Sequence, residues 1–337
     1  MEAVVLWKIC ACVTAMLVML VGACAPAANA RIGGDAPLRE FAISQCDPLP
    51  RARGGHSAER VDGQLLVMGG TDWSADRTRK TWLDDSVVFS GGAWREGPRL
   101  PAPVAHAVSC ADGGSIYLAG GTDGTRHFKD VYCLSDLASS GRWQRVAGLP
   151  MGLSAAGGAV WNRAFFVACG ETDQGLSNRM WRLDLARPQR PWQPCDPLPG
   201  AARAFPAMLE CGGSIYLLGG VAGWEPLAPL KDAYRYDPRT DRWSRLPDLP
   251  WAGYAWSAAP VGRDHALLAG QADGEVHSDL WLLDLTSMTA RKIGDAAIQT
   301  TTAPLVNVRP GEWWLIGGEP DSKKTRTNRI TVIRAAG

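Results

Sequence analysis

The sequence predicts an all-β fold in which one four-stranded unit is repeated six times around a ring. Three observations lead to this prediction. A short apolar run ending in a glycine pair recurs along the chain, a tryptophan begins a later segment of most repeats, and a proline follows that tryptophan at a constant distance. Repeats of about 20–50 residues are typical of folds that assemble one supersecondary unit many times.

The glycine pairs set the length of the repeat. Their last residues are Gly70, Gly121, Gly170, Gly220, Gly270 and Gly318, so successive pairs are separated by 48 to 51 residues. Two pairs are degenerate, because Cys169 and Ala269 stand where the first glycine is expected. The regular interval predicts six copies of similar size.

Each copy contains four predicted strands. The apolar run is followed by a second strand rich in β-branched, aromatic or leucine residues, as in 131–134. A third strand begins at Trp94, Trp143, Trp192 or Trp243, with a proline seven residues later in each case. A fourth segment of small residues, such as 155–160, precedes the next apolar run and suits the crowded innermost strand of a radial sheet.

Four strands in about 50 residues, with a glycine pair and one tryptophan, resemble the kelch motif. The resemblance covers residues 41–335 and implies a β-propeller, in which four-stranded blades surround a central channel. The last unit lacks its tryptophan strand. Residues 43–50 supply it, because they share Cys-Asp-Pro-Leu-Pro with 195–199. We therefore predict a six-bladed kelch-type β-propeller whose last blade is closed by an N-terminal strand.

The N-terminal 30 residues are typical of an export signal, followed by a linker over 31–40. Lys8 precedes an apolar stretch over 9–24 that is short for a membrane span. Cleavage after Ala30 and a lipobox with Cys24 as the lipidated residue both remain open. We expect a periplasmic or secreted protein, soluble or lipid-anchored, with no transmembrane span in its mature form.

The composition excludes several classes of function. Lys and Arg number 35 against 34 Asp and Glu, for a net charge of +1, so we expect no nucleic-acid partner. Hydrophobic residues make up 46% and charged residues 20%, which excludes a disordered chain. The histidines and cysteines lack the spacing of a zinc site, and we expect neither a metal nor an organic cofactor. Disulfide status and oligomeric state stay open.

Polar and aromatic residues recur at one predicted face of the ring. In a four-stranded antiparallel blade, the loop after the glycine pair and the loop between blades lie on the same side. The first kind of loop contributes carboxylates, and residues 71–84 form an unusually long one that we expect to be a rim or lid. The substrate-binding residues that we predict at this mouth are Arg53, Asp72, Trp73, His106, Arg203 and Trp256.

Several segments resemble the bacterial cyclically permuted mutarotases, which are related to N-acetylneuraminate epimerase. They are 69–71 with 80–85, 181–185 with 199–203, 231–236, and 314–319 with 326–327. The last resembles the epimerase segment Trp-Leu-Ile-x-Gly-Glu followed by Arg-Thr, with one more residue between Glu and Arg here. The resemblance implies that Glu319 is the proton acceptor and that Arg326 lies in the same pocket. Galactose oxidase shares the kelch core, but its copper-site residues have no matching set in this chain.

The resemblance implies an isomerase of carbohydrate metabolism that interconverts the anomers of N-acetylneuraminate or a related sugar. Opening a pyranose ring requires a base at the anomeric hydroxyl and an acid at the ring oxygen, and one carboxylate can serve as both in turn. Arginine can hold a sugar-acid carboxylate through paired hydrogen bonds, and tryptophan can stack on a sugar face. The alternative is a non-catalytic propeller that binds a glycan or a protein partner, because the fold hosts both.

Overall fold

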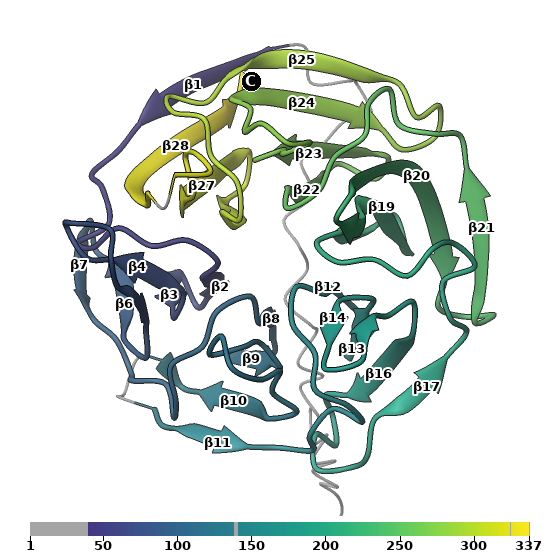
Figure 1. Ribbon diagram of the computed structural model, residues 1–337, viewed down its shortest axis with the longest axis horizontal. Helices are drawn as coiled ribbons and strands as arrows, with labels where there is room; N and C mark the ends of the chain where they lie inside the picture. The colour runs from purple at the N-terminus through teal and green to yellow at the C-terminus, as the bar shows by residue number, and fades with distance from the viewer. Residues whose placement is uncertain (1–39, 138–140, 324, 337) are drawn as a thin grey trace, which may run out of the picture.

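The computed structural model describes residues 40–137, 141–323 and 325–336. The export signal and nearly all of the linker that the sequence predicts, including Cys24 and Ala30, lie outside the described residues. Within the described residues, six four-stranded antiparallel sheets are arranged around a central axis (Figure 1). The predicted six-bladed all-β propeller is therefore confirmed.

The first three blades follow the chain in order, each from its innermost strand outward. Blade 1 consists of β2 (Ser57–Val61), β3 (Gln64–Met68), β6 (Ser86–Ser90) and β7 (Ala93–Glu96). Blade 2 consists of β8 (Val108–Asp112), β9 (Ser115–Ala119), β10 (Val131–Ser135) and β11 (Trp143–Arg145). Blade 3 consists of β12 (Gly157–Trp161), β13 (Ala164–Ala168), β16 (Met180–Asp184) and β17 (Gln193–Cys195).

The last three blades have the same order, and the sixth takes its outer strand from the N-terminus. Blade 4 consists of β18 (Ala207–Cys211), β19 (Ser214–Trp224), β20 (Leu227–Asp237) and β21 (Arg242–Leu246). Blade 5 consists of β22 (Ser257–Val261), β23 (His265–Ala269), β24 (Asp279–Asp284) and β25 (Ala290–Asp295). Blade 6 consists of β26 (Leu305–Arg309), β27 (Glu312–Gly318), β28 (Thr327–Ala335) and β1 (Phe41–Gln45).

The ring closes where the sequence predicts. Strand β1 pairs antiparallel with β28, with Phe41 opposite Ala335 and Gln45 opposite Thr331. The two ends of the propeller thus share one sheet, as Figure 1 shows at its upper left. A closed ring leaves no free sheet edge on which another chain could add a strand.

The innermost strands touch each other all around the axis, which requires small side chains. In β12, a Cβ on Gly157 would lie 2.7 Å from Cβ of Met208 in blade 4, and one on Gly158 would lie 2.1 Å from Cγ1 of Val108 in blade 2. The small-residue segment is therefore needed for the close approach of both neighbouring blades.

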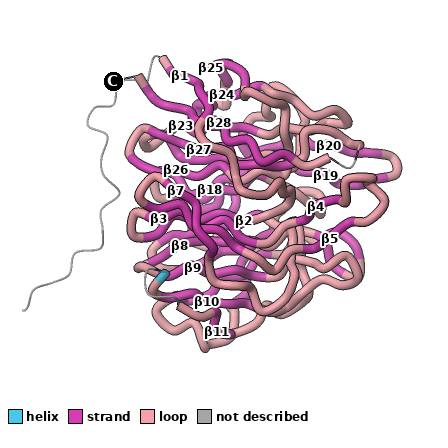
Figure 2. The backbone as a smooth tube through the Cα atoms, turned by 90° about the vertical axis from the view of Figure 1, so that its left-hand side faces the viewer, coloured by secondary structure: helices cyan, strands magenta, loops and turns pink. Residues whose placement is uncertain are grey.

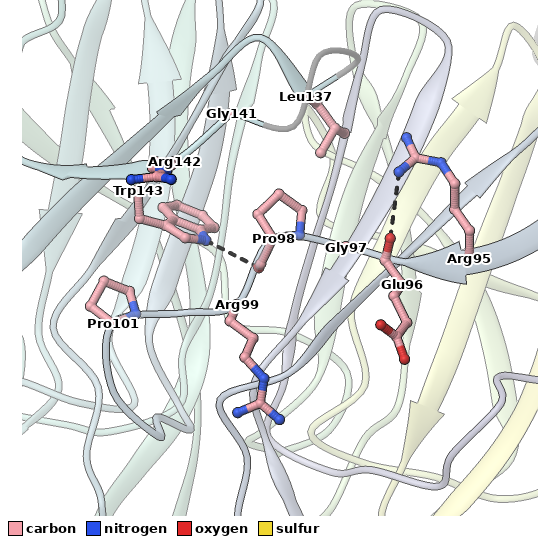
Figure 3. Close-up of a pocket in the computed structure, with 10 residues that line it drawn as sticks. All are labelled: Arg95, Glu96, Gly97, Pro98, Arg99, Pro101, Leu137, Gly141, Arg142 and Trp143. Carbon is pink, nitrogen blue, oxygen red and sulfur yellow. Dashed lines mark hydrogen bonds between the residues drawn. The ribbon is translucent and has the colours of Figure 1, made fainter.

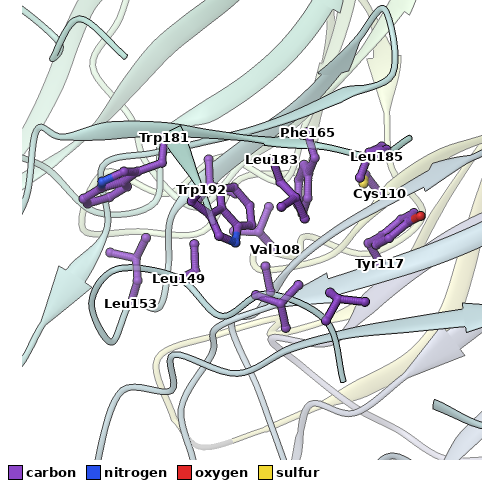
Figure 4. Packing of buried hydrophobic residues seen from close by; sticks show 14 residues of the cluster. Val108, Cys110, Tyr117, Leu149, Leu153, Phe165, Trp181, Leu183, Leu185 and Trp192 are labelled. Atoms are coloured by element: carbon purple, nitrogen blue, oxygen red, sulfur yellow. The ribbon is translucent and has the colours of Figure 1, made fainter. Parts of the chain in front are cut away.

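The repeated tryptophans join adjacent blades. Three of them donate an indole hydrogen bond to a backbone carbonyl of the preceding blade or the loop that follows it: Trp143 to Pro98 (3.4 Å), Trp192 to Ala147 (2.9 Å) and Trp243 to Asp196 (2.8 Å). Apolar side chains fill the space between the sheets, and Figure 4 shows the cluster between blades 2 and 3. Each of these three tryptophans therefore anchors one blade to the one before it.

Two further findings bear on the sequence predictions. Among the described residues there is no helix with the length and apolar character needed to cross a membrane. The described cysteines are free thiols, and Cys110, Cys169, Cys195 and Cys211 are buried. Cys169 keeps the left-handed backbone of the glycine that it replaces, with φ of 64°.

Candidate functional site

A repeated backbone motif builds one face of the ring. In every blade, a residue of the interblade loop pairs with a residue just after the glycine pair, which is the first residue after it in five blades and the second in blade 5. The six antiparallel bridges are Gly54–Thr71, Ala105–Thr122, Ser154–Glu171, Ala204–Val221, Tyr254–Ala272 and Thr301–Glu319. The two kinds of loop therefore lie on the same face, as the sequence predicts, and they surround the mouth of the central channel.

A circle of backbone hydrogen bonds frames this mouth. One residue of each interblade loop donates its N–H to the carbonyl of its counterpart in the neighbouring loop, over distances of 2.7–3.1 Å. Every member has a positive φ, between 50° and 64°. In order around the ring, the members are Gly55, His106, Ala155, Phe205, Ala255 and Thr302. The circle links all six blades and fixes the positions of the side chains at the mouth.

His106 and Phe205 are the neighbours of Ala155 in this circle. Their rings meet edge to face across Ala155, with centroids 5.2 Å apart. The His106 ring also lies over Gly55, where a Cβ would come within 2.4 Å of Cε1. Burial, followed by the nearby charges of Lys80 and Arg326, lowers the pKa of His106 to about 3. The imidazole is therefore neutral at neutral pH.

The channel contains a cavity of about 240 Å³ that is lined in part by His106 and Phe205. Its lining includes Glu59, whose Oε1 accepts a hydrogen bond of 2.7 Å from the Ser109 hydroxyl. Burial raises the pKa of Glu59 to about 7. This carboxyl group lies on the innermost strands, so it does not belong to the set at the mouth.

Glu319 and Arg326 form an ion pair at the mouth, with Oε2 and Nη1 3.2 Å apart. The Thr302 hydroxyl donates to Oε1 of Glu319 at 3.2 Å. Arg326 donates to the Thr71 hydroxyl at 3.0 and 3.1 Å and to the Thr325 carbonyl at 2.7 Å. Gly54 lies against both partners, because a Cβ there would be 2.6 Å from Cγ of Glu319 and 2.7 Å from Cδ of Arg326.

The two members of this pair differ in accessibility. The Arg326 side chain is 4% exposed, whereas the Glu319 side chain is 23% exposed. Burial lowers the pKa of Arg326, while Glu319 raises it. The guanidinium is thus held in the wall of the mouth, and the carboxylate remains open to a ligand.

Lys80 adds a second cation beside the pair. It lies on β5 (Lys80–Trp82), which forms a hairpin with β4 (Thr71–Trp73) within the long loop after Gly70. Its Nζ lies 4.5 Å from the centre of the Trp82 ring. Burial and the charge of Arg326 lower the pKa of Lys80, and Glu319 raises it. Two cations therefore face one accessible carboxylate.

Aromatic residues occupy another part of the mouth. Trp224 ends β19, is 42% exposed, and makes edge-to-face contacts with Phe205 at 6.0 Å and Tyr254 at 5.7 Å. Its indole N–H donates to Oε1 of Glu171 at 2.7 Å. Phe205 and Gly55 are opposite members of the backbone circle. The mouth therefore has a charged side, near blades 6 and 1, and an aromatic side, near blades 4 and 5.

The structure brings some of the predicted residues together. Glu319, Arg326 and His106 all lie at the mouth. Asp72 lies nearby on β4, accepts a hydrogen bond from Arg51 at 3.0 Å, and acts electrostatically on Arg326. Trp73 is half-buried on the same strand, opposite Lys80.

The prediction that Arg53 and Arg203 bind substrate at the mouth is wrong. Both side chains are completely buried in the wall. Arg203 holds both carboxylate oxygens of Asp232, at 2.6 and 2.8 Å, and donates to the carbonyl of Gly219. Arg53 donates to the Gly69 carbonyl at 3.0 Å and to one carboxylate oxygen of Asp85 at 3.2 Å. Their donors are directed at the turns of the glycine pairs, so they hold the blades together.

The stacking role predicted for Trp256 is also contradicted. Its side chain packs in the apolar cluster between blades 4 and 5, and the residue is only 4% exposed. Its indole N–H donates to the Leu218 carbonyl at 3.2 Å. A ring buried in this way has no face available to a sugar.

Three residues of the mouth were not predicted from the sequence: Thr71, Thr302 and Phe205. The sequence contains a signal for each of them. Thr302 and Phe205 occupy the same position in the repeat as His106, and the three are separated by about 100 residues, or two repeats, along the chain. Thr71 follows its glycine pair directly, as the predicted carboxylates do in other blades.

A further cavity, of about 470 Å³, lies between the outer strands β7 and β11. Figure 3 shows Arg95, Glu96 and Arg99 along it, with the indole of Trp143 hydrogen-bonded to Pro98. None of the site residues predicted from the sequence lines this cavity. It is therefore separate from the candidate site.

Comparisons with known proteins agree with the fold. Residues 55–250 match the family model described as the KLHDC2/KLHL20/DRC7 Kelch-repeats domain. The chain is 27% identical to Kelch-like protein 34 from Homo sapiens over 235 residues, which is 66% of this chain and 35% of that protein.

Bacterial relatives are also found. N-acetylneuraminate epimerase from Haemophilus influenzae (strain PittEE) is 28% identical over 201 residues, covering 58% of this chain and 52% of that protein. The protein of the same name from Yersinia enterocolitica serotype O:8 is 29% identical over 132 residues, covering 38% and 33%. The chain thus spans about half the length of these relatives or less.

Proposed function

We propose that this chain, which belongs to the kelch-repeat family, is a sugar mutarotase that interconverts the anomers of N-acetylneuraminate or a related sugar acid. The observation that carries the proposal is the Glu319–Arg326 pair, in which an accessible carboxylate is fixed at the mouth by a hydroxyl and a buried guanidinium. The relatives named N-acetylneuraminate epimerase support the choice of substrate class.

In this proposal Glu319 moves the proton. The carboxylate removes the proton of the anomeric hydroxyl while the bond from the anomeric carbon to the ring oxygen breaks and the ring oxygen is protonated. The anomeric carbon becomes an open-chain carbonyl. After rotation, the hydroxyl formed from the ring oxygen attacks the other face and the proton transfers are reversed, so the second anomer forms with no net change in protons.

The surrounding groups suit the remaining tasks. Arg326 stabilises the negative charge of Glu319 in the form that a base needs. The carboxylate of a sugar acid is attracted by Lys80, whose lowered pKa also suits it to donate a proton. Aromatic rings such as Trp224 and Phe205 offer faces to the apolar side of a sugar.

The test is anomer exchange by the purified protein. A freshly dissolved single anomer of N-acetylneuraminate is followed by NMR with wild-type protein, with Glu319→Gln, and with Glu96→Gln as a matched change on an outer strand. We expect acceleration by the wild type and by Glu96→Gln, and a loss in Glu319→Gln. If Glu319→Gln exchanged the anomers as fast as Glu96→Gln, Glu319 would not be the group that removes the anomeric proton.

The alternative is a binding protein without catalysis, as the similarity to Kelch-like protein 34 allows. An unchanged exchange rate across several sugars, together with binding of one of them, would favour this alternative. Export, with residues 1–30 removed and the propeller starting near residue 41, is part of the same proposal. Mass spectrometry of the mature N-terminus distinguishes cleavage after Ala30 from lipidation at Cys24.

A further inference from the structure

A groove extends from the mouth across blade 2. Its volume is about 630 Å³, within the range of about 300–1,000 Å³ that is usual for ligand clefts. The residues that line it come from three neighbouring blades: Lys80 and Trp82 from blade 1, 122–127 from blade 2, and Glu171 from blade 3, with His106 at its inner edge. No step of the proposed reaction uses the loop of blade 2.

The groove exists because neighbouring loops differ in height. In blade 1 the loop after the glycine pair forms the β4–β5 hairpin, whereas in blade 2 the corresponding loop is short. Figure 2 shows β4 and β5 extending toward one side of the molecule. Gly124 lies against the Trp82 indole, where a Cβ would be 2.4 Å from Cζ2. The indole thus forms a wall above the low loop.

The groove and the Glu319 site are contiguous. Lys80 and His106 line the groove. The His106 ring lies against Gly55 and Glu319 lies against the adjacent Gly54, because an added Cβ would be 2.4 Å from Cε1 of His106 at the first position and 2.6 Å from Cγ of Glu319 at the second. At the other end, Glu171 is fixed by the Trp224 indole at 2.7 Å. A molecule that reaches Glu319 therefore has a continuous path along blade 2.

The lining contains both donors and acceptors. Arg126 is 71% exposed and lies over the Phe128 ring at 5.1 Å. His127 is oriented by a bond of 2.9 Å between Nδ1 and the Ser154 hydroxyl. Asp123 and Glu171 supply carboxylates. Sugar hydroxyls both donate and accept, so a mixed lining of this kind suits a sugar better than a single charge.

We propose that this groove is a second sugar subsite, which binds the residue linked to the sugar whose anomeric carbon reacts at Glu319. The ligand class is then the reducing end of an oligosaccharide, because ring opening requires a free anomeric hydroxyl on the first sugar. The inference rests on the proposed function for the place of that first sugar.

The experiment compares N-acetylneuraminate with its α2,8-linked dimer by equilibrium titration in NMR. Wild type, Arg126→Ala, Arg126→Ala/His127→Ala and the control Arg99→Ala, in the loop that follows β7, are titrated with both sugars. We expect the dimer to bind the wild type about tenfold more tightly. Each groove variant loses most of this difference, and its affinity for the dimer falls several-fold more than its affinity for the monomer. The control keeps the wild-type values.

Equal affinities of wild type for the two sugars would overturn the inference, as would equal losses for both sugars in the groove variants or no binding of either. The single variant Arg126→Ala changes an exposed side chain, so the result does not depend on the double variant folding. The wild-type protein could bind the dimer through the groove without accelerating anomer exchange. This result would contradict the proposed mutarotase activity and would still support the second subsite.

Discussion

Two arginine–carboxylate pairs in this propeller have the same chemistry and different surroundings. Arg203 is completely buried, and its bidentate bonds to Asp232 are supplemented by the Tyr234 hydroxyl, which donates to the same carboxylate at 2.9 Å. Arg326 is nearly as buried, and the two carboxylates are similarly exposed, at 17% for Asp232 and 23% for Glu319. Glu319, however, has one contact of 3.2 Å with its arginine and receives a single additional bond, from Thr302. The first carboxylate is saturated by the protein, whereas the second keeps capacity for a ligand.

The largest expected effect is on stability, at the saturated pair. Asp232→Ala leaves the Arg203 guanidinium buried without its partner, which costs about 3–5 kcal/mol in the free energy of unfolding. Chemical denaturation measures this loss. Glu319→Gln keeps a hydrogen-bonding side chain at a partly exposed position and is expected to cost less than about 1 kcal/mol. Similar losses in the two variants would contradict the division into a structural and a functional pair.

Two glycines allow a matched test by overpacking. A Cβ at Gly54 would press on Glu319 and Arg326, and one at Gly200 would lie 2.4 Å from the Tyr234 hydroxyl and 2.7 Å from Nη2 of Arg203. Each alanine variant is expected to lose about 1–3 kcal/mol of stability. Only Gly54→Ala is expected to slow anomer exchange, by about 100-fold, because it displaces the reacting carboxylate. Equal exchange rates in the two folded variants would count against the assignment.

A smaller effect is expected from Arg326→Lys. The ammonium keeps the charge beside Glu319 but cannot make the same fork of bonds to Thr71 and Thr325. Loss of a charge-assisted hydrogen bond of about 1.5–3 kcal/mol corresponds to a decrease of about 10- to 100-fold in the exchange rate. The rate is measured on the same single anomer. A wild-type rate would mean that the charge alone is sufficient.

The last effect concerns Glu59, a carboxyl group that accepts a hydrogen bond of 2.7 Å from the Ser109 hydroxyl. Its pKa is 4.5 in a freely solvated chain, and burial raises it to about 7 in the folded protein. The folded state therefore favours the protonated form, and the stability that this form contributes is lost as the pH rises from about 4.5 to 7.

Glu59→Gln removes this dependence. The melting temperature of the variant minus that of the wild type is expected to be larger at pH 8 than at pH 5. Thermal unfolding of both proteins at the two pH values measures the difference. A stability difference that does not change with pH would show that Glu59 ionises normally in the channel.

The sequence was sufficient to predict the six-bladed architecture, because each repeat contains residues that are needed for its own turns and strands. Glycine pairs at turns, a tryptophan at the outer strand of four blades and small residues on inner strands recur at about 50 residues, and residues 46–50 repeat 195–199. Closure of blade 6 by β1 followed from that last similarity. Each of these features depends on neighbours that the repeat itself supplies.

The site could be predicted only in part, because the direction of a side chain depends on packing between blades. Arg53 and Arg203 lie in the predicted loops. The side chain of each, however, is buried against a glycine pair, where it donates to a backbone carbonyl and forms an ion pair with a carboxylate. Trp256 likewise fills the space between two blades. The contact of Glu319 with Thr302 joins two parts of a blade that only the bridge between Thr301 and Glu319 brings together.

The most direct test of the contrast between the two pairs is the exchange rate of a single N-acetylneuraminate anomer in the presence of folded Glu319→Gln. General acid–base catalysis by one group typically contributes about 10²–10⁴-fold. We therefore predict that this variant loses about 100-fold or more of the wild-type acceleration while its unfolding transition stays close to that of the wild type. A folded variant that exchanges the anomers at the wild-type rate would contradict the central role of Glu319.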